Sequence, residues 1–154
     1  MQLLDRFCKS VIFTLFFLMV VTTFLQIIFR YVFSAPLTWS EELSRYCLVW
    51  LTFVGAAVGL RAKIHVAVEA VTRLLPAGLK LLIIRFNYLI ITVFAAVLVK
   101  HGFELSLFNM NQLSPAMHIP IGLVYAAVPV GGLLIFIFAV EKLVSPGEEG
   151  GATN

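Results

Sequence analysis

The stretch FRYVFSAPLTWSEELSR, residues 29–45, separates two long apolar segments and carries charged residues flanked by aromatic side chains. Pro36 has no backbone N–H and pushes its predecessor out of helical geometry, so the first apolar segment should end before it. Thr38 and Glu41 are three residues apart and match a capping box, which satisfies free N–H groups at a helix start. We therefore expect a turn at the membrane surface, followed by a new helix.

The charges of this turn indicate a structural or docking role. Glu41 and Arg45 are four residues apart on the expected helix, and Glu42 and Arg45 are three apart, so either carboxylate is placed to pair with the guanidinium. Trp39 should anchor the helix start at the membrane interface, and Arg30 adds a further charge to the same patch. Because no His, Cys or metal-ligand cluster accompanies the two carboxylates, a catalytic site is disfavoured.

The composition is that of an integral membrane protein. Of the 154 residues, 61% are hydrophobic and 12% are charged, whereas soluble domains have ~45–50% apolar and ~25% charged residues. A transmembrane helix needs ~20 mostly apolar residues, so the chain has room for four spans with short connections. We predict an all-α membrane protein with transmembrane helices over residues 11–29, 43–60, 79–99 and 121–144. Residues 1–144 then form a single membrane domain, and residues 145–154 form a disordered cytoplasmic tail.

Residues 61–75 have the pattern of a short amphipathic helix that lies in the interface between the second and third spans. Apolar residues recur at helical spacing on one side, and His65 and Glu69 occupy the other. This pair supplies only two ligands, whereas a zinc site needs three or four. We interpret His65 and Glu69 as part of a solvated polar face.

Three residues or pairs within the spans bear on helix packing. Gly55 and Gly59 form a small-xxx-small pattern, which lets another helix approach closely, either within this chain or from a partner. Arg85 intrudes at the start of the third span, where its side chain can snorkel to the headgroups or contact a partner. Pro129 predicts a kink in the fourth span.

The basic residues are unevenly distributed between the two membrane faces. Eight of the eleven Lys and Arg residues fall on the side that carries both termini, and Arg30, Arg45 and Lys100 fall on the other. By the positive-inside rule, both termini should lie in the cytoplasm. The turn at residues 29–45 should then face the periplasm or the cell exterior.

Taken together, these segments resemble the small membrane subunit (DctQ or SiaQ type) of tripartite ATP-independent periplasmic, or TRAP, transporters. The resemblance rests on the ordered set FRYVF, SAPLTWSEELSRY, VWLTFVGAAVGLR, KIHVAVE, RLLP and SPAMHIPIGLVYAAVP. It covers nearly the whole membrane region. Glu69 is a departure, since the family is expected to favour Asp there.

The resemblance implies a four-span subunit of the bacterial inner membrane that associates with a large transport subunit (DctM or SiaM type) and with a periplasmic substrate-binding protein. The implied activity is sodium-driven uptake of organic acids such as C4-dicarboxylates or sialic acid. The implied surroundings also include the lipid bilayer, and no nucleic acid is expected as a partner.

The residues themselves favour a supporting role in such a transporter. The sequence shows no inverted repeat, no matching pair of Gly/Pro-interrupted helices and no acidic residue in the middle of a span, which are the usual marks of a substrate or ion site. We therefore expect a scaffold and not an enzyme, with no cofactor of its own and with sodium coupling in the large subunit. The charged turn would orient helices or help to dock the binding protein.

Two other classes of protein remain as alternatives. A stand-alone four-helix exporter needs a membrane-embedded carboxylate to bind cations, and the first span has none. A membrane anchor of a redox complex that binds haem or quinone needs paired His residues inside its spans. Here His65, His101 and His118 all fall in or near connections.

Overall fold

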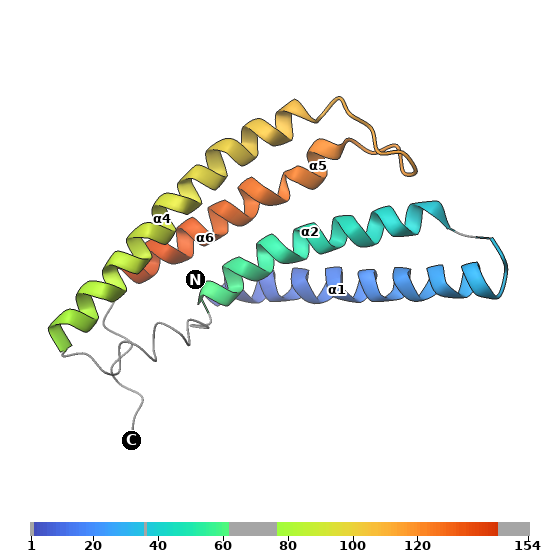
Figure 1. The fold of residues 1–154 in the computed structure, drawn as a ribbon. Coiled ribbons are helices and arrows are strands. Elements are labelled where there is room, and N and C mark those ends of the chain that lie inside the picture. Colours follow the sequence, from blue (N-terminus) through green and yellow to red (C-terminus); the bar gives the residue numbers. More distant parts are fainter. Residues whose placement is uncertain (1, 36, 62–76, 145–154) are drawn as a thin grey trace, which may run out of the picture.

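The computed structural model describes residues 2–35, 37–61 and 77–144. Its elements are α1 (Gln2–Tyr31), α2 (Thr38–Arg61), α4 (Ala77–Phe108), α5 (Ile121–Tyr125) and α6 (Ala127–Val144) (Figure 1). Four stretches are long and apolar enough to cross a membrane: Leu3–Tyr31, Thr38–Arg61, Leu82–Phe108 and Ile121–Val144. The prediction of an all-α protein with four spans is confirmed. Beyond Arg61, the predicted interfacial helix lies outside the described residues, as does the predicted tail.

Two of the helices extend past the predicted apolar spans, and a close pair of polar side chains lies about one turn apart on each polar end. In α1, Lys9 Nζ lies 2.7 Å from the carboxylate of Asp5, one helical turn away. In α4, His101 Nδ1 lies 3.0 Å from Glu104 Oε2, and the helix continues to Phe108. The third helix therefore continues past residue 99, where the predicted span ended.

The fourth span is interrupted where Pro129 predicted a kink. Pro129 cannot donate to the carbonyl of Tyr125, so the helical hydrogen-bond ladder is broken there, between α5 and α6. The Ala126 amide still donates to the Gly122 carbonyl at 2.9 Å, and Ala126 keeps helical dihedrals. The chain therefore passes from α5 into α6 as one membrane-length segment.

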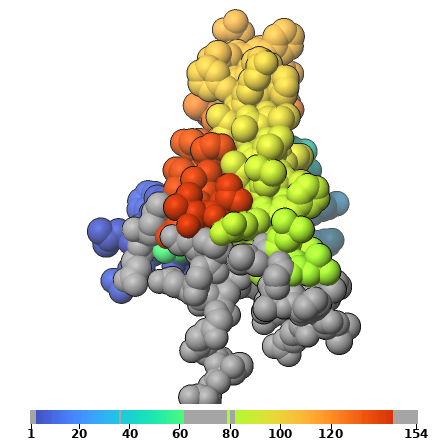
Figure 2. Space-filling view, turned by 90° about the vertical axis from the view of Figure 1, so that its left-hand side faces the viewer, coloured from blue at the N-terminus to red at the C-terminus, as the bar shows by residue number. Residues whose placement is uncertain are grey.

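The spans lie in a row in the order α1, α2, α6, α4. One antiparallel hairpin consists of α1 and α2, the other consists of α4 with α5 and α6, and the two hairpins meet along α2 and α6, which run parallel. Figure 1 shows the second hairpin inclined to the first, and Figure 2 shows α4 running alongside α5 and α6. We call the end with residues 32–37 and 109–120 the loop end, and the end where α1 begins and α6 finishes the terminal end.

The hydrophobic core joins the two hairpins near the terminal end. Its buried members come from three helices: Ala57 and Leu60 of α2, Tyr88 of α4, and Phe138 and Ala139 of α6. Phe138 is fully buried. The Arg61 guanidinium lies over its ring, with the guanidinium carbon 5.2 Å from the ring centre. This arrangement gives the guanidinium a cation–π contact inside the bundle.

Gly131 sets how closely α6 approaches α2. A methyl group at this position would lie 2.5 Å from Cβ of Phe53 and 3.0 Å from the carbonyl carbon and oxygen of Phe53. The neighbouring Gly132 faces α4, where a methyl group would lie 3.1 Å from Cβ of Leu98. Two adjacent glycines therefore let α6 contact a helix on each side.

Candidate functional site

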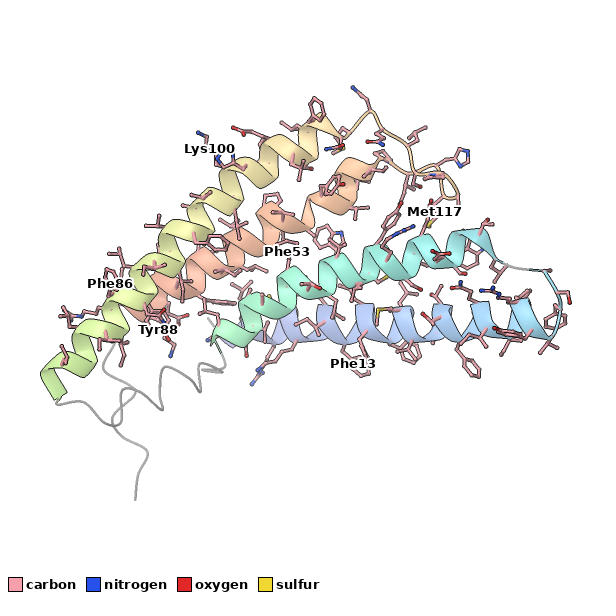
Figure 3. The ribbon with its side chains drawn as sticks, in the orientation of Figure 1. Phe13, Phe53, Phe86, Tyr88, Lys100 and Met117 are labelled. Carbon is pink, nitrogen blue, oxygen red and sulfur yellow. The ribbon has the colours of Figure 1, made fainter. Side chains whose placement is uncertain are left out.

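The site is built around Glu42, in the first turns of α2. Its side chain is only 5% exposed. Oε1 accepts a hydrogen bond from the Ala116 amide and Oε2 accepts one from the Met117 amide, both at 3.0 Å. Figure 3 shows Met117 above the start of α2, on the loop that joins α4 to α5. Because hydrogen bonds to an ionised acceptor are stronger than neutral ones, Glu42 ties the two hairpins together at the loop end.

The loop is folded so that it offers these two amides to Glu42. Ser114 is 2% exposed, its amide donates to the Ile119 carbonyl at 2.9 Å, and its carbonyl accepts from the His118 amide at 3.2 Å. The Ser114 hydroxyl accepts from the Ile119 amide at 3.4 Å and also interacts with the Glu42 carboxylate. With these bonds made, the Ala116 and Met117 amides are left to point at Glu42.

His118 turns the loop back toward α5. It has a φ of 55°, in the left-handed region that non-glycine residues seldom adopt. Its amide donates to the Ser114 carbonyl, and its exposed ring lies with Nδ1 3.4 Å from the Ala116 carbonyl oxygen. The sequence interpretation placed His118 in a connection, which the structure confirms, but did not foresee this turn.

The parallel packing of α2 and α6 explains why Glu42 meets this loop. Phe53 lies against Gly131, and Arg61 lies over Phe138 toward the terminal end. If the same pairing of positions is continued from Phe53 toward the loop end, the first turns of α2 lie level with the residues just before α5. The contact therefore joins residues 74 and 75 positions apart in the chain, which no local pattern reveals.

The predicted pairing of Glu41 or Glu42 with Arg45 is wrong. Glu42 turns to the loop, and no ion pair joins either carboxylate to Arg45 in the described part of the chain. The charge of Arg45 still acts on Glu42 from a longer distance. Glu41 and Arg45 are both exposed, where a surface ion pair would contribute only ~0–1 kcal/mol. Glu42 is instead bound by the half-buried Ala116 and Met117 amides.

The predicted capping box is not formed either. Thr38 is already the first residue of α2, and no hydrogen bond joins Thr38 to Glu41 among the residues that the structure describes. Instead the amide and the hydroxyl of Ser40 both donate to the Leu37 carbonyl, at 3.3 and 2.7 Å. A carbonyl before the helix therefore binds the start of α2.

The other residues predicted at the charged turn lie on the surface of the loop end. Trp39 is 40% exposed. Arg30 is exposed and its guanidinium carbon lies 5.9 Å from the centre of the Tyr31 ring. Tyr31 and Phe33 are 75% and 62% exposed, so an aromatic rim surrounds the charges, as is typical of a membrane–water interface.

Gly55 and Gly59 do not pack against another of the described helices. A methyl group at either position would have no atom within 4 Å, among the neighbours examined on the described helices. The close helix contacts use Gly102, Gly122, Gly131 and Gly132 instead. The small-residue pattern in α2 is therefore open, while glycines without that spacing form the internal contacts.

The remaining predicted residues divide between α4 and the undescribed segment. Arg85 is exposed on α4 and forms no ion pair with a described residue. His65 and Glu69 lie outside the described residues. Within the described ranges, no group of three or more His, Cys, Asp or Glu side chains could hold a metal ion.

Comparisons with known proteins agree on one family. Residues 19–147 match the family described as "Tripartite ATP-independent periplasmic transporters, DctQ component". A TRAP transporter small permease protein of Haemophilus influenzae is 27% identical over 83% of this chain and 80% of its own length.

Two further relatives carry substrate names. The C4-dicarboxylate TRAP transporter small permease protein DctQ of Rhodobacter capsulatus is 31% identical over 64% of this chain and 44% of its own length. The sialic acid TRAP transporter permease protein SiaT of Haemophilus influenzae is 30% identical over 75% of this chain but only 19% of its own length. Since the names of the relatives cover C4-dicarboxylate, ectoine and sialic acid systems, they do not single out a substrate class.

Proposed function

Because this chain belongs to the DctQ family of TRAP small permease subunits, we propose that it is the scaffold on which the large permease component of the transporter is held in the membrane. Members of the family are transport components and not enzymes. The chain is thus a multi-pass protein of the inner membrane within a tripartite system that has a large permease component. Its own task within that system is the proposal.

The observation that carries this proposal is the row of helices. A row leaves the broad faces of each helix uncovered. In the apolar 18-residue stretch that identifies α1 as a span, only 6% of the residues are buried within the chain, and in the corresponding stretch of α4 only 11% are buried. A protein that conducts a solute by itself would enclose a polar path between its helices. This chain instead offers membrane-length apolar surface on which another membrane protein can pack.

The SiaT relative supports the same arrangement. The region that matches this chain makes up about a fifth of that permease protein. We infer that the rest of that protein includes the large component, because two units in one polypeptide have a high effective concentration, which maintains their contact. We infer that this chain makes the corresponding contact with a separate large component, which would contain the sodium and substrate sites for uptake of organic acids.

We assign the Gly55 and Gly59 face of α2 to this contact. Both positions are open in the described structure, and small residues allow close backbone approach between membrane helices. Exposed Leu48 and Thr52 continue the same face toward the loop end. A helix of the large component packed here would lie against α2, the helix through which the first hairpin contacts the second.

A double substitution tests this assignment. Gly55→Leu with Gly59→Leu should reduce co-purification of the large component by at least tenfold, because the side chains would fill the space that its helix occupies; ~1.4 kcal/mol of lost binding suffices for a factor of ten. The melting temperature of the small subunit alone should not fall, because leucine favours the helix over glycine. Ala96→Leu, at an exposed position of α4, serves as the matched control. Normal co-purification by the double variant would refute the assignment.

We further propose that the loop end faces the periplasm and receives the substrate-binding protein. This orientation places both termini in the cytoplasm, in agreement with the distribution of basic residues. Exposed Arg30, Glu41 and Arg45 would then lie where a soluble partner can reach them. Charges at the rim of an interface mainly affect the association rate and its salt dependence.

Charge reversal tests this docking role. Glu41→Lys with Arg45→Glu should lower uptake at limiting binding protein, and the defect should change with ionic strength because exposed charges are screened by salt. The large component should still co-purify. Uptake at the normal rate would argue against docking at this face, and labelling of a cysteine at Phe108 from the cytoplasmic side only would contradict the orientation.

A further inference from the structure

The two hairpins are joined by different interactions along their length. Near the terminal end they share the apolar core around Phe138. Midway, the Gly131 backbone lies against Phe53. Toward the loop end, Figure 1 shows α2 and α5 diverging, although the two helices remain in contact. Among the hydrogen bonds of the described residues, those that join the two hairpins in this interval end on Glu42.

We propose that Glu42 is the tie that sets the angle between the two hairpins. Its two oxygens bind two consecutive amides, so the contact restrains direction as well as distance. Eleven residues of helix separate Glu42 from Phe53, which is about 16 Å at ~1.5 Å per residue. A rotation of about 10° around the Phe53 contact would move Glu42 by about 3 Å, far more than a hydrogen bond tolerates. The carboxylate thus holds the hairpins against opening.

The loop is bound tightly enough to pass this restraint to the second hairpin. The Gly122 amide donates to the Asn109 carbonyl at 3.1 Å, and the Ile121 amide donates to the Gln112 carbonyl at 2.8 Å. These bonds fasten the loop to the end of α4 and to the start of α5. A displacement of the Ala116 and Met117 amides must therefore move these helices with it.

Distances between spin labels test the proposal in the full-length protein reconstituted in nanodiscs. One label pair replaces Ile27 of α1 and Phe103 of α4, which are 50% and 58% exposed in the loop-end half. The reference pair replaces Phe13 and Phe86, which are 71% and 62% exposed nearer the terminal end. Cys8 and Cys47, 2% and 4% exposed, are free but buried, so a sample without added cysteines measures background labelling.

With Glu42→Ala, the distance across the loop-end pair should lengthen, by about 3 Å for a rotation of about 10°, and its distribution should broaden, while the distance across the reference pair should not lengthen, because Phe86 lies on the other side of the Phe53 contact (Figure 3). Glu42→Gln, which has nearly the same shape, should broaden the loop-end distribution and covers the case in which the alanine variant does not fold. Glu41→Gln is the matched control, because Glu41 is exposed on the same turn. Unchanged distributions in both Glu42 variants, or an equal change with Glu41→Gln, would overturn the proposal.

Discussion

Alanine in place of Gly131 is expected to force α6 away from α2 and to destabilise the bundle by about 1–3 kcal/mol, the range typical of overpacked interiors. The added methyl group would meet Cβ of Phe53 and also its backbone carbonyl. A side chain can rotate away from such a contact, but the backbone of a helix cannot. The two helices must therefore separate, which weakens the contacts of the hydrophobic core between them near the terminal end.

The measurement is the melting temperature of the purified protein, monitored by far-ultraviolet circular dichroism. Gly55→Ala is the matched control, because a methyl group at Gly55 meets no atom within 4 Å. Alanine also favours the helix over glycine by up to ~1 kcal/mol. The two substitutions should thus shift the melting temperature in opposite directions, or Gly55→Ala should leave it unchanged. Equal effects would contradict the assigned α2–α6 contact.

The second large effect is expected at Phe138. Replacing Phe138 by alanine should lower the free energy of unfolding by about 3 kcal/mol. Substitutions of Phe by Ala in cores cost ~3–5 kcal/mol. The lower end applies in a bilayer, because lipid is as apolar as the core and only the packing part of the loss remains. Phe138 is 0% exposed and is also the ring beneath the Arg61 guanidinium, so the substitution removes both contacts.

Unfolding in mixed micelles measures this loss, and Phe13→Ala provides the control. Phe13 is 71% exposed on the outer face of α1, so its removal should change the free energy of unfolding by less than ~1 kcal/mol. A similar loss for both variants would show that the core around Phe138 does not carry the stability. Restoring part of the stability with Phe138→Leu would support packing as the cause.

The spans were predictable from the sequence because each depends on local composition. Apolar segments of membrane length separated by Pro36 and by the polar connection lead to four helices, whatever their neighbours. The interruption near Pro129 was also local, since it follows from a missing N–H. The residues of the charged turn were recognised as important for the same reason.

Their partners could not be predicted in this way. Either Glu41 or Glu42 was expected to pair with Arg45, because helical spacing is all that a sequence pattern offers. In the folded chain, the carboxylate of Glu42 is bound by two amides more than 70 residues further along the sequence. Local spacing does show that a charge needs a partner near the membrane, but it does not show which partner is closest.

The glycines make the same division clear. Gly55 and Gly59 have the spacing of a packing motif and remain open, whereas Gly131, which has no such spacing with a second glycine of its face, touches the backbone of Phe53. Any helix face with small residues permits close approach, so the pattern alone does not choose a neighbour.

By itself, the sequence determined that this protein is a membrane protein with four helices and a charged turn between the first two, because the bilayer acts on each segment separately. Only the tertiary structure decided that the helices form a row, that α2 and α6 run parallel with Gly131 between them, and that Glu42 binds the loop between α4 and α5. The physical reason is that these contacts join segments far apart in the chain, and their energies depend on distances that exist only after the helices have packed.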